Sequence, residues 1–333
     1  ERKGPEPDLK TMSAFLLINY TRPDKTAETL DNLRWVKDLL LFCDGPKAGK
    51  DSKKNTETRN LLSDFAALRK AGGYKTQTLF AEQNLGPKLG PLTAIQWLFR
   101  ERETGHIVED DILLAPGFEA AHEQGLSLIA GRPDIFAVAE GHPLPDCPTK
   151  WLETRMARLV AWSSTREKIG PLLEKASQEK PLWSGKTTAQ RARLLNGLHP
   201  KTKVFLWKEF WRLDVRPQWS WHYHLMQHQL EAGLLGLTPT ARLHENTGVD
   251  GSGANCINLF GETEGFTQKE LYQWGEKPDA GGKDAQSERK METERYGRIH
   301  QALGRILYKM TPVPWKNIWK PAKTRCQKRG GTP

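Results

Sequence analysis

Three consecutive carboxylates, Glu109-Asp110-Asp111, are the residues of this sequence whose types and spacing most directly indicate chemistry. Adjacent carboxylates repel one another, so a nearby cation stabilises them. Proteins bind a hard divalent ion such as Mg2+ or Mn2+ through one or two carboxylates together with phosphate oxygens. The triplet therefore indicates a site for a metal ion and a phosphate group. The alternative is a solvated acidic turn that binds nothing.

Alternating apolar and amphipathic segments place this triplet at the end of a strand. Short apolar runs predict strands, and residues from 24 onward, residues 55–71 and a segment opened by Pro91 have the apolar spacing of helices. This alternation predicts an α/β fold with a mostly parallel sheet flanked by helices. The predicted strands are 13–19, 38–43, 75–80 and 134–139, with residues 106–108 leading into the triplet. Because open α/β sheets bind ligands beyond the carboxyl ends of their strands, the triplet lies where a ligand is expected.

Polar segments follow the other predicted strands in a recognisable order. Asn19-Tyr20-Thr21-Arg22-Pro23 follows the first strand, Asp44-Gly45-Pro46 the second, and Glu82-Gln83-Asn84-Leu85-Gly86 precedes the Pro91 helix, before the acidic triplet and Pro116-Gly117-Phe118. This order resembles bacterial nucleotide-diphospho-sugar transferases of the hemolytic-protein-like family and, more distantly, the Golgi N-acetylglucosaminyltransferases. Both groups have the GT-A glycosyltransferase fold. The resemblance covers about residues 13 to 255 and is most specific in the N-terminal half.

The resemblance implies a role for individual residues. Asp44 is similar to the carboxylate that accepts a hydrogen bond from a uracil ring, and Arg22 to a contact of the donor phosphate or nucleoside. Asp111 is the implied metal ligand, with Mn2+ or Mg2+ as the cofactor. Sugar or ribose hydroxyls would contact Glu109 and Asp110. The nucleotide-sugar site would also include Asn19 and Lys88. Without the resemblance, Asp44 is an ordinary turn residue, and Arg22 and Lys88 are solvated surface cations.

The second half departs from the family pattern. A Trp-rich family motif corresponds to residues 160–166, which keep only Trp162, and a second motif corresponds to residues 221–225. The family's catalytic aspartate falls at His222 with one residue of slippage, so His222 is the expected catalytic base. His224 is its competitor, and polar-face histidines without a catalytic role are the alternative. Should neither histidine act, the acidic candidates are Asp214, Glu245 and Asp250.

Several segments of the second half are expected to form particular elements. The sequence predicts strands at 158–162 and 234–238, and helices at 165–175, 221–232 and 291–310. Residues 177–203 are polar and basic, which is typical of an insertion or a mobile loop. Residues 244–258 are rich in Gly and Asn, and we expect them to form a loop that closes over the donor.

The chain is expected to divide into three parts. Residues 1–12 would be a disordered leader or an added remnant, with Met12 as the natural start. Residues 13–275 would form the GT-A domain, with a nucleotide-sugar half at 13–140 and an acceptor half at 141–275. Residues 276–333 would form a linker, an amphipathic helix and a basic tail that carries Trp315 and Trp319. The fold class is thus an α/β domain of GT-A type with a helical, basic C-terminal extension.

Charge is distributed unevenly along a chain with a formal net charge of +10. Residues 150–212 hold 14 basic and 5 acidic side chains, and residues 283–333 hold 13 and 4. Basic residues beside tryptophans suit an anionic membrane surface, so we expect the tail to make a peripheral membrane contact. A general nucleic-acid-binding role is not expected, because the basic residues are confined to these stretches. The four scattered cysteines and the lack of a secretory signal or an apolar 18-residue run predict a cytoplasmic protein, peripheral at the inner face of the membrane.

These observations lead to a functional hypothesis with two alternatives. The chain is expected to be a metal-dependent, inverting glycosyltransferase that moves a hexose from a UDP-sugar to a glycan or lipid-linked acceptor, in surface polysaccharide synthesis. One alternative is a non-catalytic GT-A-like binding protein whose basic tail binds membrane or nucleic acid. The other is a nucleotidyltransferase, which uses a similar sheet and acidic metal site but normally has a Gly-rich, basic loop after its first strand.

Overall fold

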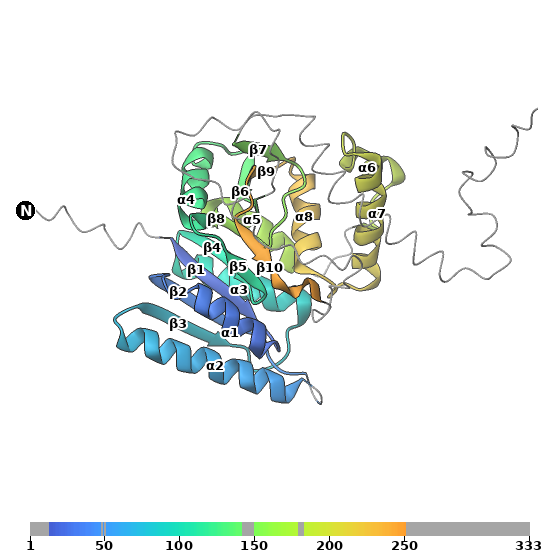
Figure 1. Cartoon of the computed structure of the whole chain (residues 1–333). Helices are drawn as coiled ribbons and strands as arrows, with labels where there is room; N and C mark the ends of the chain where they lie inside the picture. The colour runs from blue at the N-terminus through green and yellow to red at the C-terminus, as the bar shows by residue number, and fades with distance from the viewer. Residues whose placement is uncertain (1–12, 48, 50, 142–149, 179–182, 251–333) are drawn as a thin grey trace, which may run out of the picture.

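The computed structural model describes residues 13–47, 49, 51–141, 150–178 and 183–250. In this part of the chain an eight-stranded sheet has the order β3-β2-β1-β4-β8-β6-β9-β7, and β5 and β10 form a second, two-stranded sheet (Figure 1). The strands are β1 Ala14–Asn19, β2 Asp38–Cys43, β3 Lys75–Phe80, β4 Thr104–Glu109, β5 Ile112–Leu114, β6 Ile135–Val138, β7 Trp151–Thr154, β8 Ala161–Thr165, β9 Leu235–Pro239 and β10 His244–Asn246. The first four strands of this order, β3 to β4, are all parallel, whereas β8 is antiparallel to both of its neighbours.

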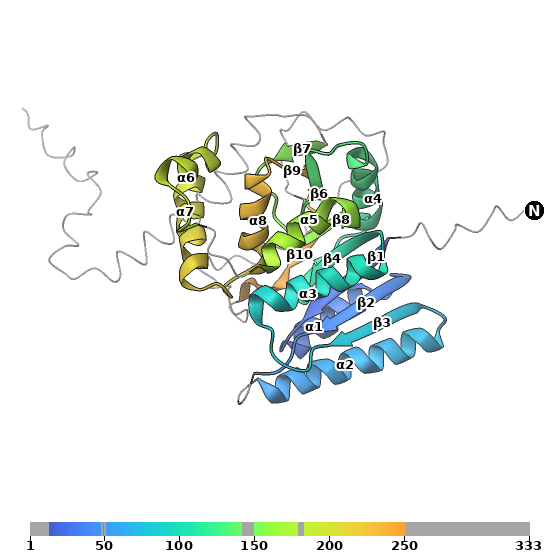
Figure 2. The same cartoon turned by 180° about the vertical axis from the view of Figure 1, so that it is seen from behind.

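Helices cover both faces of the large sheet (Figures 1 and 2). Alternate residues of β1 point to opposite faces, so Phe15 and Leu17 pack with α1, α2 and α4, while Leu16 packs on the other face with α3, α5 and α8. The helices are α1 Pro23–Asn32, α2 Ser52–Ala71, α3 Gly86–Glu101, α4 Phe118–Ile129, α5 Arg166–Ser177, α6 Thr188–Leu194, α7 Pro200–Val215 and α8 Trp221–Glu231, followed by the 3-10 helix η1 Thr247–Asp250. The α/β fold with a mostly parallel sheet flanked by helices is therefore confirmed.

The start of α3 differs from the prediction. The helix begins at Gly86 with Pro87 in its first turn, and Pro91 lies inside the helix rather than at its start. The reason is a cap supplied from a distant part of the chain, because the carboxylate of Asp44 accepts hydrogen bonds from the backbone N–H groups of Leu85 and Gly86. Those two N–H groups have no acceptor within the helix, and no local sequence motif indicates which residue will accept their hydrogen bonds.

The second half contains more regular structure than predicted. The polar stretch 177–203, expected to be an insertion or loop, instead contains α6 and the beginning of α7, because Thr187 and Gln190 form a reciprocal capping box. The expected loop at 244–258 begins with strand β10, which pairs with β5. The predicted strand at 158–162 lies later, at β8, and Trp151–Thr154 forms a strand that the sequence did not reveal. The helix at 221–232 is confirmed, and Gly233 follows it with a φ of 69°.

Several predictions concern residues outside the described part of the chain. They are the leader at 1–12, the part of the expected loop 244–258 that follows residue 250, the linker and basic tail within residues 276–333, and the helix at 291–310. The domain boundaries at 275 and 276 stay predictions for the same reason. Among the described residues, no helix combines the length and apolar character needed to cross a bilayer.

A buried polar network joins β4, α4 and β8 beneath the sheet. Ser163 Oγ lies 2.6 Å from His106 Nδ1 and 2.7 Å from His122 Nδ1, and His106 Nε2 lies 3.2 Å from Glu123. If His106 donates from Nε2 to Glu123, its Nδ1 must accept the single hydroxyl proton of Ser163. His122 then donates from Nδ1 to Ser163, which makes its Nε2 the unprotonated nitrogen. That nitrogen has no hydrogen-bond partner among the described residues, and the ring stacks on Phe118 at 3.9 Å between centroids.

We predict that this network makes the protein less stable in mild acid. Burial lowers the pKa of His122 well below its usual value, so below about pH 6.5 the unfolded chain binds a proton that the folded chain does not. The free energy of unfolding should then fall by about 1.4 kcal/mol per pH unit for this group as the pH drops from 6.5. Urea unfolding of the native protein and His122→Asn at several pH values tests this. The free energy of unfolding of the variant should lack that part of the pH dependence. Above pH 7.5 it should differ from that of the native protein by a constant amount. An unchanged slope would contradict the assignment.

Candidate active site

A cleft of about 690 Å³ lies at the carboxyl ends of β1, β2 and β4. These ends meet because β1 is parallel to both neighbours. The starts of α1 and α2 complete the walls. The polar side chains that line the cleft come from Asn19, Tyr20, Thr21, Arg22, Asp24, Lys25, Asp44, Lys47, Asp51, Lys54, Asn84, Glu109, Asp110 and Asp111. The cleft therefore brings together six of the eight site residues predicted from the sequence.

Arg22 is held between two carboxylates of the acidic triplet. Its Nη1 donates to Asp111 Oδ2 at 2.8 Å, and its Nη2 donates to Asp110 Oδ1. Although burial alone would lower the pKa of Arg22, the two carboxylates raise it above its usual value. This contact spans from the loop after β1 to the end of β4, so it fixes the floor of the cleft as well as its charge.

One guanidinium does not fully compensate three adjacent carboxylates. Burial, together with the charges of Asp111 and Asp110, raises the pKa of Glu109 to about 8. Burial also raises the pKa of Asp110 to about 6, although Arg22 opposes this rise. Burial and mutual repulsion thus favour the protonated form of these carboxyl groups, which means that the cluster is short of positive charge.

The donor set around Asp111 fits a divalent cation that also binds a substrate phosphate. Asp111 Oδ1 is buried and has no hydrogen-bond partner among the described residues. Gly248 of η1 packs against the same carboxylate, and a Cβ at this position would lie 1.9 Å from Asp111 Oδ2. In the described ranges, no group of three or more His, Cys, Asp or Glu side chains is placed to hold a metal by itself. A cation at Asp111 would need further ligands, and phosphate oxygens and water are suitable ones.

Asp44 organises the wall of the cleft opposite the triplet. Its Oδ1 accepts hydrogen bonds from the N–H groups of Gly45 at 2.7 Å and Leu85 at 2.8 Å, and its Oδ2 accepts from Gly86 at 3.0 Å and from Asn84 Nδ2 at 3.1 Å. Burial raises the pKa of Asp44, and the backbone donors oppose that rise. A Cβ at Gly45 would lie 2.1 Å from the carbonyl carbon of Gln83, so the two loops approach closely only because residue 45 is glycine.

Two residues of α2 form hydrogen bonds to the loops that follow the strands. Asn55 Nδ2 donates to the carbonyl oxygens of Tyr20 at 2.8 Å and Asp44 at 2.9 Å. Arg59 Nη2 donates to the carbonyl of Asp44 at 3.1 Å and also to that of Ala81. These bonds tie together the loops after β1, β2 and β3. In the sequence both residues are ordinary polar members of a helix, so no signal distinguishes them from solvated ones.

The remaining predicted residues have different positions. Asn19 lies at the cleft, but its amide donates to the carbonyls of Leu17 and Phe42 and accepts from Thr26, so it supports the strand ends. Lys88 is fully buried, is absent from the described cleft lining, and donates from Nζ to the carbonyl of Gln178 at 2.9 Å. A solvated surface lysine was the alternative for this position, and its burial excludes that.

The expected base is also separated from the cleft lining. His222 is not among the described residues that line the cleft, and its Nε2 lies 3.4 Å from the carbonyl oxygen of Ala157. The neighbouring Trp221 makes the link instead, since its Nε1 donates to Glu109 Oε1 at 3.4 Å. Helix α8 therefore begins against the triplet and contacts it through the indole of Trp221 rather than the imidazole of His222. His224 is buried, and its Nε2 lies 2.8 Å from the carbonyl oxygen of Pro217.

Sequence reasoning missed the lysines of the cleft. Lys25, Lys47 and Lys54 come from the first turn of α1, the loop after β2 and the start of α2. Each is a common surface residue in its local sequence, and only the fold places all three around one opening. Ammonium groups at this position suit an anionic ligand such as a diphosphate.

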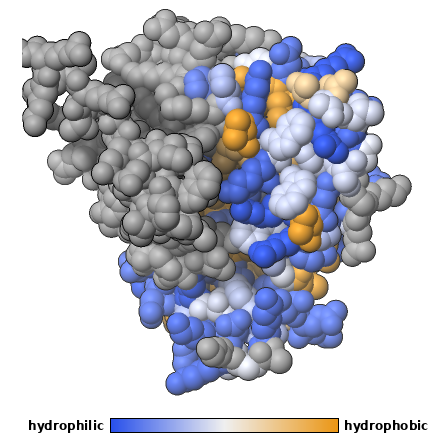
Figure 3. Space-filling view, turned by 90° about the vertical axis from the view of Figure 1, so that its right-hand side faces the viewer, coloured by the Kyte–Doolittle hydropathy of each residue, from blue (hydrophilic) through white to orange (hydrophobic). Residues whose placement is uncertain are grey.

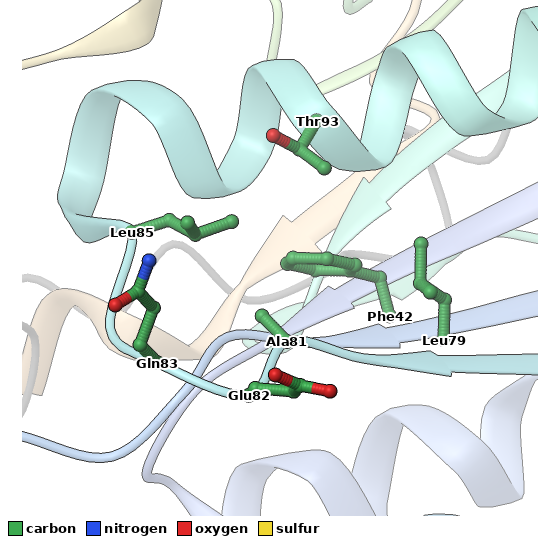
Figure 4. Close-up of a pocket in the computed structure, with 7 residues that line it drawn as sticks. All are labelled: Phe42, Leu79, Ala81, Glu82, Gln83, Leu85 and Thr93. Atoms are coloured by element: carbon green, nitrogen blue, oxygen red, sulfur yellow. The ribbon is translucent and has the colours of Figure 1, made fainter.

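A second cavity of about 450 Å³ lies between α3 and the ends of β2 and β3 (Figure 4). Phe42, Leu79 and Leu85 supply its apolar walls, Thr93 points into it from α3, and Glu82 supplies a carboxylate. Its lining, as far as the structure describes it, includes no cation. The basic side chains that suit a phosphate group therefore line the first cleft rather than this cavity.

No protein-family model and no curated protein sequence matches this chain. Among solved structures, residues 1–349 of TarS from S. aureus align at 13% identity with a TM-score of 0.33, covering 48% of this chain and 49% of that one, so the chain spans about half of the TarS fragment. A putative glucose-1-phosphate thymidylyltransferase from Bacillus anthracis aligns at 10% identity and a TM-score of 0.31, covering 51% and 76%. A glycosyltransferase that glycosylates the major capsid of PBCV-1 aligns at 10% identity and a TM-score of 0.26, covering 56% and 76%. At these values no residue role is transferred from them.

Replacing Asp44 by Asn should destabilise the cleft wall more than an equivalent change nearby. The new amide would direct N–H groups at two of the four donors, so we expect a loss of about 2 kcal/mol in the free energy of unfolding, typical for a hydrogen-bonded charged group. Asp51→Asn is the matched control, because Asp51 Oδ2 accepts from the hydroxyl of Tyr20 at 3.1 Å at the same opening. Its cost should stay below about 1 kcal/mol. Equal losses for the two variants in urea unfolding would show that Asp44 is not the organising residue.

Proposed function

We propose that the protein is a glycosyltransferase of GT-A type that uses a nucleoside-diphosphate sugar, with UDP as the nucleotide and a divalent cation as cofactor. The observation that carries this proposal is the cleft at parallel strand ends, in which a guanidinium, three lysines and a cation-deficient carboxylate cluster surround one opening. Its volume of about 690 Å³ is within the range of small-molecule and cofactor sites. The acceptor would be a hydroxyl of a glycan or a lipid-linked sugar.

Charge explains why a cation is part of the proposal. A diphosphate would be repelled by Glu109, Asp110 and Asp111 unless positive charge lay between them. Mn2+ or Mg2+ held by Asp111 would supply that charge and would stabilise the departing UDP. Arg22 already bonds to the carboxylates and would orient the cluster, while the lysines at the opening would bind phosphate oxygens. Glu109 and Asp110 would accept hydrogen bonds from sugar or ribose hydroxyls.

The nucleobase would lie between the loops after β1 and β3. In the structure the side-chain oxygens of Asp44 accept bonds from Gly45 in its own loop and from the loop after β3, so we assign Asp44 to shaping the base pocket. Recognition of a uracil N–H by its carboxylate would require one of these bonds to open. Loop backbone groups and Asn84 offer further contacts for the base.

A non-catalytic nucleotide-sugar-binding protein is the second candidate. It is favoured by one observation, that His222 does not lie among the described residues of the cleft lining. Transfer of sugar to an acceptor, or slow hydrolysis of the donor, would separate the enzyme from this candidate. The membrane contact of the basic tail and a cytoplasmic location also stay proposals.

The proposal predicts that Asp111→Asn removes cation-dependent nucleotide binding without unfolding the protein. Isothermal titration of UDP in the presence of Mn2+ should show at least a tenfold weaker affinity than the native protein, because the variant loses a ligand charge of the cation. EDTA should weaken the affinity of the native protein for UDP to a similar level. Asp31→Asn is the matched control, since Asp31 lies on α1 with an exposed partner, Arg34, away from the cleft lining. Unchanged Mn2+-dependent affinity in Asp111→Asn would exclude the metal assignment.

The turnover of two variants identifies the catalytic base. His222→Ala should lower turnover about 100- to 10,000-fold while leaving donor affinity unchanged, as expected for a general base. Glu109→Gln tests a further candidate beside Asp214, Glu245 and Asp250, because the Glu109 carboxylate lines the cleft and bonds to Trp221. If His222→Ala retains near-native turnover at saturating donor and Glu109→Gln does not, the base role moves to Glu109.

A further inference from the structure

Helix α7 lies on the right-hand side of Figure 1, which faces the viewer in Figure 3. The exposed face of this helix carries a stripe of apolar side chains. Val204, Trp207, Trp211 and Val215 are spaced three or four residues apart and are between 37% and 59% exposed. Residues at this spacing share one face of a helix. Large apolar side chains gathered on one exposed face mark an interaction surface rather than scattered surface residues.

The opposite face of α7 anchors the helix in the protein. Leu206, Phe210 and Leu213 are buried in a cluster with residues of α8, including Met226 and Leu230. The outward stripe is therefore not an unfinished core that awaits packing. It lies on a helix whose inner face is already packed in the protein core.

Contacts with the preceding segment hold this helix further in place. Asp214 accepts hydrogen bonds from the backbone N–H groups of Trp183 and Ser184. Arg191 donates from Nε to the carbonyl of Trp183 at 3.0 Å, and its guanidinium lies 5.7 Å from the ring centre of Trp207. We define the α7 surface as this stripe together with the flanking cations Lys203, Lys208, Arg212 and Arg216.

The α7 surface is strongly basic. Residues 183–216 contain eight Lys and Arg and only two acidic residues, Glu209 and Asp214. Both acids are engaged within the protein, since Glu209 is buried against Arg212 and Asp214 binds backbone N–H groups. Within this segment positive charge therefore exceeds negative charge, even though Arg212 is paired with Glu209.

We propose that the α7 surface docks the protein onto an anionic lipid membrane. Tryptophan and valine side chains can enter the boundary between headgroups and acyl chains, while lysines and arginines lie over anionic headgroups. This surface lies within residues 203–216, so it is separate in the sequence from the basic tail at 311–333. It does not depend on the proposed function of the cleft.

Charge argues against two of the alternatives. Residues 283–333 carry 13 basic and 4 acidic side chains, so this part of the chain has the same sign as the α7 surface, whereas residues 251–282 carry 2 basic and 5 acidic ones. Docking of residues 251–282 on the stripe would leave the native protein unable to bind vesicles, which the test below detects. A second copy of the surface would be repelled because it carries the same sign of charge. Nucleic acid matches the charge, but binding to phosphates gives no reason for aliphatic valines at both ends of the stripe.

Vesicle co-sedimentation of the full-length protein tests the proposal. The probes are vesicles of phosphatidylcholine alone and vesicles with 30 mol% phosphatidylserine, at low and moderate salt. The native protein should bind the anionic vesicles, and Trp207→Ser/Trp211→Ser should weaken that binding at least about tenfold. Lys203→Glu/Lys208→Glu should weaken it about 25-fold or more, from about fivefold for each basic residue near the surface. Circular dichroism confirms that each variant is folded.

The matched control is Leu68→Ser on α2, because Leu68 is an apolar residue on another helix that is more exposed than the residues of the stripe. It should bind the vesicles like the native protein. Absence of native binding, or equal binding by the stripe variants, would overturn the proposal. So would an equal loss of affinity for a single-stranded oligonucleotide in the tryptophan variant, or a native dimer in sedimentation analysis that Trp211→Ser separates into monomers.

Discussion

The contact between Arg22 and the carboxylates of Asp110 and Asp111 is the interaction on which the candidate site depends. Three adjacent acids at the end of a buried strand would repel one another, and the arginine reaches them from the next strand of the sheet. Because β1 and β4 are parallel neighbours, this reach is short. The same contact leaves the cluster partly uncompensated, so the fold holds the carboxylates together while keeping them able to accept further positive charge.

The first half of the fold could be predicted because each element has its own local signal. Strands such as Asp38–Cys43 are short apolar runs that end at turn residues, and both ends of this strand were predicted correctly. The parallel order follows from the alternation of strands and helices. From these strand ends alone, one can infer that the loops after β1, β2 and β4 share a cleft, and Arg22, Asp44 and the triplet do so.

The parts that could not be predicted depend on contacts between distant residues. The start of α3 is set by Asp44, which is 41 residues away from Leu85 in the sequence. The burial of Lys88 and the support given by Asn55 and Arg59 are likewise tertiary effects, since a polar residue in a helix gives no sign of which carbonyl it will meet. In the second half the strands are short and mixed in direction, so periodicity gave weaker guidance there. The contact of Asp44 with a nucleobase, the binding of a metal by Asp111 and the role of His222 as a base stay predictions.

The pairing of β5 with β10 has a consequence for how the protein is made. Thr247 donates to the carbonyl of Asp111 across 136 residues of sequence, and Gly248 packs on the carboxylate of the same residue. Most of the cleft is built from residues before 112, yet one wall next to Asp111 comes from the end of the described chain. During synthesis from the N-terminus, the strands that carry the triplet therefore emerge long before the segment that covers it. Until residues 244–248 leave the ribosome, the acidic cluster is open on that side, so the finished geometry around Asp111 requires a segment that is made more than a hundred residues later.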